Sequence, residues 1–104
     1  MARTVVWSEP AWHDLEQVAD YIAQDSLHYA ATFVREVRDA ARSLGTVAER
    51  GRAVPELSDP AVRELLVGRY RLMYRVTAST VQIAAFVHGA RDFRGPGHSQ
   101  PVDR

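Results

Sequence analysis

The sequence contains no cysteine, which excludes disulfide scaffolds, thiolate zinc sites and cysteine nucleophiles. It also contains no apolar run approaching the roughly 18 residues of a membrane-spanning helix. The N-terminal residues MARTVVWSEP lack the apolar core of a signal peptide. We therefore expect a cytoplasmic protein without a membrane partner. Its 104 residues suffice for one modest hydrophobic core.

Several motifs that carry catalysis or hold cofactors are absent as well. The glycines at positions 51 and 68 are isolated, so no glycine-rich phosphate loop is present, and no serine lies in a nucleophile elbow. No pair among the four histidines has zinc-ligand spacing, and no histidine–carboxylate cluster occurs. The sequence thus predicts neither a metal site nor a cofactor.

Lysine is also missing, so all 13 basic residues are arginine. Arginine keeps its charge when desolvated and binds phosphates and carboxylates in a bidentate manner, although a genomic bias would give the same composition, since alanine is abundant too. The net charge is zero, but residues 1–62 hold 6 basic and 10 acidic groups, whereas residues 63–104 hold 7 and 3. We therefore expect an anionic partner to bind the C-terminal part.

The first half of the chain predicts one strand and two helices. Residues 3–7 are β-branched and aromatic, which favours a short strand. Ser8 is a good N-cap for an apolar stripe with helical spacing that ends near Gln24. After Ser26 a second stripe of this kind continues, and the helix should end at Gly45, a residue that tolerates the left-handed conformation at C′. Two helices with so short a link form an antiparallel hairpin.

The second half predicts a sheet. Residues 45–61 contain two glycines and two prolines and have no clear period, so they form a long connection, of a length that is often functional. Strands are predicted over residues 62–67, 69–77 and 80–88, where the side chains alternate. Residues 95–104 are polar and rich in proline and glycine, which indicates a flexible tail.

These elements predict a two-layer α+β domain over residues 1–94, with the order β-α-α-β-β-β and an antiparallel sheet packed against the helical hairpin. The order of the strands within the sheet stays open. Alternation places one set of side chains toward the helices: Tyr70, Leu72, Tyr74 and Val76, with Val81, Ile83, Ala85 and Val87 of the last strand. The opposite face of the sheet is left to water or to a partner.

Arginines dominate the part of the sequence that forms that opposite face. The predicted partner-binding set is Arg63, Arg69, Arg71, Arg75, Arg91 and Arg94. Such a set suits phosphate or an acidic protein, and the alternative is a solvated face kept soluble by charge. Trp12 lies at the edge of its helical stripe, where it either seals the core or anchors another chain. His88, where the last strand ends, could move protons near neutral pH or could be an ordinary strand-end residue.

Two stretches carry a family resemblance. Residues 63–76 (RELLVGRYRLMYRV) and 81–91 (VQIAAFVHGAR) resemble the ParE/RelE superfamily of toxins, which belong to type II toxin–antitoxin modules. Upstream, Val-Trp-Ser (6–8) resembles the first strand of the family. Gly-Arg (51–52), followed by Val-Pro-Glu (54–56), resembles the loop before its second strand. The resemblance covers about residues 4–92, and the fold that it implies has the element order derived above.

The resemblance implies one of two mechanisms. The RelE branch cuts messenger RNA in the ribosomal A site, which requires a base, an acid and cations around the scissile phosphate. The residues available for this here would be His88, Arg71, Arg75 and Arg91. No tyrosine follows the last strand, however, and Phe93 has no proton to donate. The ParE branch inhibits DNA gyrase by binding, and the ending Val-His-Gly-Ala-Arg resembles that branch more closely.

We therefore expect a growth-inhibiting toxin without catalytic residues of its own that binds DNA gyrase. A RelE-type ribosome-dependent endoribonuclease and a non-toxic interaction module are the alternatives. The resemblance also implies a cognate antitoxin that forms a hetero-oligomer with the toxin, wrapping an acidic segment over the arginines and an apolar helix along the hairpin. Sequence-specific binding of nucleic acid is not expected.

Overall fold

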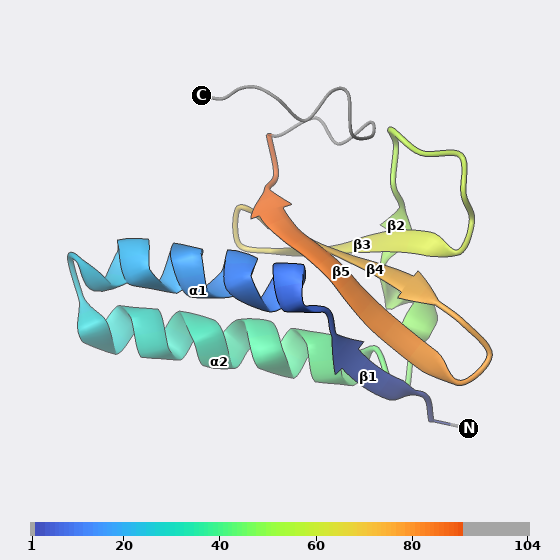
Figure 1. Cartoon of the computed structure of the whole chain (residues 1–104), viewed down its shortest axis with the longest axis horizontal. Helices are drawn as coiled ribbons and strands as arrows, with labels where there is room; N and C mark the ends of the chain where they lie inside the picture. Colours follow the sequence, from blue (N-terminus) through green and yellow to red (C-terminus); the bar gives the residue numbers. More distant parts are fainter. Residues whose placement is uncertain (1, 91–104) are drawn as a thin grey trace.

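A computed structural model of the chain describes residues 2–90. Figure 1 follows the elements along the chain: β1 (Thr4–Trp7), α1 (Glu9–Ala23), α2 (Leu27–Ser43), a short 3-10 helix (Ala48–Arg50), β2 (Arg52–Ala53), β3 (Val62–Val67), β4 (Tyr70–Val76) and β5 (Thr80–His88). The predicted tail at residues 95–104 lies outside the described part. No helix within residues 2–90 is both long and apolar enough to cross a membrane.

Side-chain caps fix where the two helices begin. The Ser8 hydroxyl accepts a hydrogen bond from the backbone N–H of Ala11, and the Ser26 hydroxyl accepts one from that of Tyr29, so both predicted N-caps are confirmed. Helix α2 has its C-cap at Leu44, so the predicted end at Gly45 is confirmed. Gly45 does not use its tolerance of a positive φ, which among residues 2–90 occurs at Gly68, at 59°. Gly45 is needed for space instead, since a Cβ there would lie 2.8 Å from the carbonyl oxygen of Arg3.

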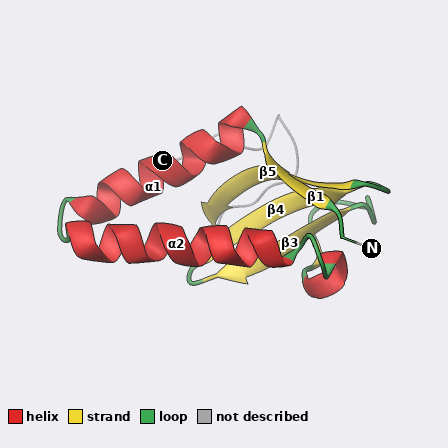
Figure 2. Ribbon diagram, turned by 90° about the horizontal axis from the view of Figure 1, so that it is seen from below, coloured by secondary structure: helices red, strands yellow, loops and turns green. Residues whose placement is uncertain are grey.

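The helical hairpin covers one face of a five-stranded sheet, which confirms the predicted α+β class (Figure 2). The strand order is β1-β5-β4-β3-β2. The strands β2 to β5 pair antiparallel, whereas β1 pairs parallel with β5, so the sheet is mixed rather than fully antiparallel. This parallel pair brings the first and last strands of the described chain together.

The main core lies between the sheet and the hairpin. On β4, Leu72 and Tyr74 are fully buried in it, as the alternation predicts. From the helices, Leu15 and Val37 pack against these side chains with at most 1% of their surface exposed. These apolar side chains leave water on folding, which is the dominant stabilisation of a domain of this size.

An irregularity in β5 reverses which side chains face the helices. Tyr74 pairs with Ile83, but Met73 pairs with Ala85, so Ala84 is an extra residue, as in a β-bulge. Beyond it, Phe86 joins the main core, and Ala85 and Val87 face the other way. The prediction that both of these residues face the helices is therefore wrong, because strict alternation does not anticipate an inserted residue.

The connection between α2 and β3 wraps around the β3 edge of the sheet. On the helix side, the Tyr74 hydroxyl accepts from the Gly51 N–H at 2.9 Å and donates to the Ala48 carbonyl at 2.7 Å. The strand β2 then pairs with β3 at the edge. Beyond β2, Val54 and Leu57 pack in a second apolar cluster on the far side of the sheet, completed by Val62, Met73, Ala85 and Val87. We call this side the outer face.

The outer face is therefore covered in part by the chain itself. The expectation that it is left wholly to water or to a partner is wrong, because the aperiodic connection carries two apolar side chains that need burial. Val54 is 2% exposed and Met73 is 1% exposed as a result. This cover also decides the surroundings of the arginines.

Candidate functional site

Arg71 lies on the outer face, as predicted, but it is only 4% exposed. Its two terminal nitrogens bind the carboxylate of Glu56 at 2.8 and 2.6 Å, and its Nε donates to Glu64 at 2.6 Å. Glu64 is 1% exposed, and its second oxygen accepts from Arg52 at 2.8 Å. The hydrogen bonds from Arg71 to Glu56 raise the pKa of the guanidinium, against the effect of burial. We call these four residues the Arg71 cluster.

The geometry of the Arg71 cluster makes it a structural feature of the fold. Glu56 comes from the connection, whereas Glu64 and Arg71 come from adjacent strands. The bidentate contact of Arg71 with Glu56 therefore ties the connection to the sheet. The prediction that Arg71 offers its charge to a partner from an open face is wrong in this respect, since two carboxylates already neutralise it.

The other predicted arginines do not form one row with Arg71. Arg75 is exposed and pairs with Asp59 at 3.0 Å, where the Ala61 N–H and then Arg75 hold the pKa of Asp59 below its ordinary value. Arg63 lies opposite Tyr74 in the ladder, on the helix side, and donates to the Gly51 carbonyl at 2.7 Å. Its predicted place on the outer face is therefore wrong.

The remaining arginines of the predicted set lie at or beyond the ends of the strands. Arg69 is exposed in the tight turn between β3 and β4, where Gly68 supplies the positive φ that a two-residue hairpin turn requires. Arg91 and Arg94 lie outside the described residues. Among the predicted arginines within residues 2–90, the exposed ones are thus Arg69 in the turn and Arg75 on the outer face.

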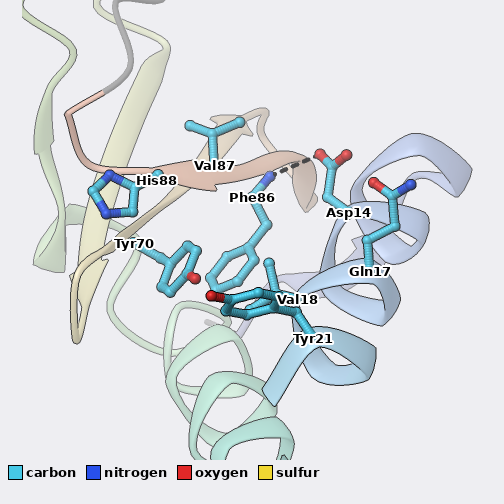
Figure 3. Close-up of a pocket in the computed structure, with 8 residues that line it drawn as sticks. All are labelled: Asp14, Gln17, Val18, Tyr21, Tyr70, Phe86, Val87 and His88. Atoms are coloured by element: carbon cyan, nitrogen blue, oxygen red, sulfur yellow. Dashed lines mark hydrogen bonds between the residues drawn. The ribbon is translucent and has the colours of Figure 1, made fainter. Parts of the chain in front are cut away.

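His88 lies in a pocket at the end of β5, on the helix side of the sheet (Figure 3). The pocket has a volume of about 290 Å³ and is lined by Asp14, Gln17, Val18, Tyr21, Tyr70, Phe86, Val87 and His88. The imidazole meets the Tyr70 ring edge-on, with centroids 5.6 Å apart, and its Nδ1 accepts from the Ala90 N–H at 3.1 Å. The walls combine aromatic and apolar side chains with the polar groups of Asp14, Gln17 and His88.

Asp14 joins α1 to β5 in this pocket. Its carboxylate accepts the Phe86 N–H at 3.1 Å (Figure 3). The strand β1 ends at Trp7, opposite Ile83, so it does not reach this part of β5. Asp14 therefore takes the place of a strand partner for an amide at the sheet edge.

Within the described part of the chain, the residues that a nuclease would use do not come together. Tyr70 pairs with His88 and Arg71 with Val87, so His88 and Arg71 lie on opposite faces of the sheet. Arg75 follows Arg71 on the outer face, and Arg91 is outside the described residues. Within residues 2–90, no group of three or more histidines and carboxylates is arranged to hold a metal ion.

Trp12 lies in the first part of α1 and contacts Trp7 of β1 and Arg38 of α2. Its ring is partly buried and meets that of Trp7 edge-on at 5.4 Å, so it helps to seal the main core. The Arg38 guanidinium lies 5.8 Å from the Trp12 centroid, within cation–π distance. Its predicted role in binding a partner stays a prediction.

A second group of arginines, on α2, was not among the predicted site residues. Arg35, Arg38 and Arg42 follow one another at spacings of three and four, which places them on one side of a helix. A depression of about 180 Å³ is lined by Arg38, Arg42 and the β1 residues Val5 and Trp7. The spacing alone could have revealed this row, but charged residues on an amphipathic helix usually mark a solvated face.

Comparison with known proteins places these features in context. Residues 5–93 match the family described as ParE toxin of type II toxin-antitoxin system, parDE. Toxin RelE2 of Caulobacter vibrioides is 38% identical over 88 residues, which cover 84% of this chain and 96% of that protein. A chain of the chromosomal ParDE TA system from P. aeruginosa shares the fold with a TM-score of 0.72, at 23% identity and with 84% of this chain and 96% of that chain covered.

Proposed function

Because the chain belongs to the ParE toxin family of type II toxin–antitoxin systems, we propose that it inhibits growth by binding DNA gyrase. On this proposal a cognate antitoxin binds the toxin and neutralises it in a hetero-oligomer. Membership of this family supports the antitoxin as a partner. The protein acts in the cytoplasm, where gyrase is found.

The observation that best supports binding over cleavage is the separation of His88 from the arginines of β4. Cleavage of RNA at a phosphate needs a proton carrier and cations that converge on the same atoms. Here His88 opens toward the helices, whereas Arg71 lies on the outer face with both Glu56 and Glu64 bound to it. Arg71 would have to leave two carboxylates before it could stabilise a phosphorane.

Two assays with the purified toxin test this function. We expect the toxin to inhibit DNA supercoiling by gyrase and to leave messenger RNA intact on translating ribosomes. In the same assays, His88→Ala distinguishes catalysis of RNA cleavage from inhibition by binding, because a methyl group cannot carry a proton. We expect the concentration of toxin that inhibits gyrase to change less than about threefold in His88→Ala. A change of that size corresponds to less than about 1 kcal/mol of binding free energy. Cleavage of messenger RNA with supercoiling unaffected would refute the gyrase proposal.

The second candidate function is that of a RelE-type endoribonuclease acting on ribosome-bound messenger RNA. The observation that favours it is the relative at 38% identity, whose name is Toxin RelE2. On this alternative His88 is the proton carrier, and His88→Ala abolishes cleavage. A third outcome, unimpaired growth of a bacterial host that contains the folded protein, would indicate a non-toxic interaction module.

A further inference from the structure

The linked ends of α1 and α2 project past the sheet and carry exposed apolar side chains. Figures 1 and 2 both show the link between the helices lying beyond the ends of the strands. Tyr21, Leu27 and Tyr29 lie in this region and are 69%, 77% and 58% exposed. Large apolar side chains that gather on a surface indicate contact with another molecule. We call residues 20–29 the hairpin tip.

The pocket at the end of β5 adjoins the hairpin tip. Tyr21 belongs to both, since it lines the pocket together with Tyr70 (Figure 3). Tyr29 lies one helical turn before Phe33 on the same side of α2, and the Phe33 ring meets the Tyr70 ring edge-on with centroids 5.7 Å apart. A row of aromatic side chains therefore leads from the tip toward a recess of about 290 Å³, which can enclose a side chain of a partner.

The formal charge around the hairpin tip is of one sign. Residues 4–34 contain no arginine, and the chain contains no lysine. The same residues hold five acids, which are Glu9, Asp14, Glu16, Asp20 and Asp25. Of these, Asp20 and Asp25 lie in the tip itself and are exposed. A cationic surface is therefore attracted to the tip, and an anionic surface is repelled.

We propose that the hairpin tip and the adjoining pocket form the surface with which the toxin binds a basic patch on DNA gyrase. This inference rests on the proposed function, because it assumes that gyrase is the target. An enzyme that acts on DNA carries arginine and lysine side chains that neutralise phosphates, and these complement Asp20 and Asp25. Tyr21 and Tyr29 supply the anchors, since tyrosine is enriched among the residues that dominate binding energy.

The charge of the tip disfavours other occupants. A nucleic acid would bring its phosphates against the aspartates. In a contact between the tips of two copies of this chain, the same aspartates would face each other. An acidic segment of an antitoxin would be repelled in the same way. The arginines of the outer face, which would themselves repel a basic patch, have no part in the proposed contact.

Replacing the exposed tyrosines tests the apolar part of the surface. The probe is purified gyrase holoenzyme, whose affinity for the full-length toxin is measured by biolayer interferometry, together with inhibition of supercoiling. We expect Tyr21→Ser with Tyr29→Ser to weaken both at least about tenfold, because two aromatic anchors are lost. The matched control, Val6→Ser with Leu66→Ser, removes two apolar side chains of β1 and β3 that are 45% and 53% exposed. It should change both less than about threefold.

Charge reversal tests the electrostatic part. We expect Asp20→Lys with Asp25→Lys to weaken binding to gyrase at least about tenfold at low salt, because like charges then meet across the contact. The loss should shrink at high salt, where exposed charges are screened. The matched control, Glu36→Lys with Asp39→Lys, reverses two exposed acids of α2 outside the tip and should change the affinity less than about threefold.

The outcomes separate this surface from the proposed function. If gyrase binds wild-type toxin and the tip variants equally, the surface is refuted while gyrase stands as the target. If the control pairs lose as much affinity as the tip pairs, the contact is not confined to the tip, and the assignment is wrong.

Two further results would also be decisive. If the tip variants lose affinity for the protein encoded beside the toxin gene and not for gyrase, the tip binds the antitoxin, and our assignment is wrong. If gyrase does not bind wild-type toxin, the proposed function itself fails. Circular dichroism checks that every variant is folded, which is expected because all the replaced side chains are exposed.

Discussion

Two arginines on β4 show that the contribution of the same side chain to stability depends on its surroundings. Arg71 and Arg75 lie four residues apart on β4 and on the same face of the sheet, with Met73 between them. The Arg71 side chain is 5% exposed and faces two carboxylates, whereas that of Arg75 is 49% exposed and faces one. Removing Arg71 would leave Glu64 buried without its closest cation, but removing Arg75 would leave Asp59 in contact with water.

This contrast predicts different losses of stability for two identical substitutions. We expect Arg71→Met to lower the free energy of unfolding by about 3 kcal/mol, because the buried Glu64 carboxylate then keeps only the contact with Arg52, whose side chain is 63% exposed. Arg75→Met should cost less than about 1 kcal/mol, since an exposed pair is screened by solvent. Urea denaturation of both variants measures the difference, and equal losses would contradict the assignment of Arg71 as a buried structural cation.

The alternation of β4 correctly predicted which face Arg71 occupies, but not what surrounds it there. Glu56 lies in a connection without periodicity, and no local pattern relates it to a strand 15 residues further along the chain. His88 was identified as a strand-end residue, yet its position relative to the arginines depends on the extra residue at Ala84. The residue pattern of a single strand predicts neither contacts between distant segments nor the insertion of one residue.

At the scale of elements, the connection between α2 and β3 is held to the sheet from both sides. Tyr74 binds its first part through two hydrogen bonds on the helix side, and Arg71 binds its later part on the outer face. Burial raises the pKa of the Tyr74 phenol above its ordinary value of 10.0, because the charged form would lose its hydration.

Removing the Tyr74 hydroxyl should therefore destabilise the protein. We expect Tyr74→Phe to cost about 1–3 kcal/mol, because the Gly51 N–H and the Ala48 carbonyl are left unpaired in the interior. Tyr70→Phe is the matched control and should be nearly neutral, since the Tyr70 hydroxyl makes no side-chain hydrogen bond to residues 2–90. Thermal and urea unfolding compare the two, and equal effects would show that the hydroxyl does not anchor the connection.

The raised pKa of Tyr74 adds a dependence on pH to the same comparison. A phenol whose pKa is higher in the folded state stabilises fully below its unfolded value of 10.0, and that contribution is lost as the pH rises above it. Wild-type protein should lose this part of its stability above pH 10, whereas Tyr74→Phe should not.

Elements with strong local signals could be predicted, and those defined by tertiary contacts could not. Both helices and the strands β3, β4 and β5 lie within one or two residues of their expected ranges, because caps and periodicity are local. The parallel pairing of β1 and the edge strand β2 could not be predicted. The former joins residues far apart in the chain, and the latter is two residues long and has no period of its own.

At the scale of the whole molecule, acid should weaken the protein partly through Asp59. Its pKa is lowered below the ordinary value of 3.8 by the Ala61 N–H and by Arg75. A carboxyl with a depressed pKa stabilises the folded state above the unfolded value, and this stabilisation is lost as the pH falls through the folded one. We expect the loss of stability below pH 3.8 to be smaller in Asp59→Asn than in wild type.

The measurement is the free energy of unfolding as a function of pH for both proteins. Asp59→Asn should be the less stable of the two at pH 7, where wild-type Asp59 is ionised and paired, and the two curves should converge in acid. Curves that stay parallel from pH 7 to pH 2 would mean that Asp59 makes no pH-dependent contribution.

The inserted residue at Ala84 makes the last strand sensitive to chain length. Deleting that one residue would restore an even ladder, and every side chain after it would turn over. Phe86 and His88 would then emerge beneath the α2–β3 connection, while Val87 would enter the space that Phe86 fills among the helices. Deleting this one residue would therefore destabilise the protein more than most substitutions within the same strand. Homologous chains should accept other residues at position 84 far more readily than a change in the number of residues in β5.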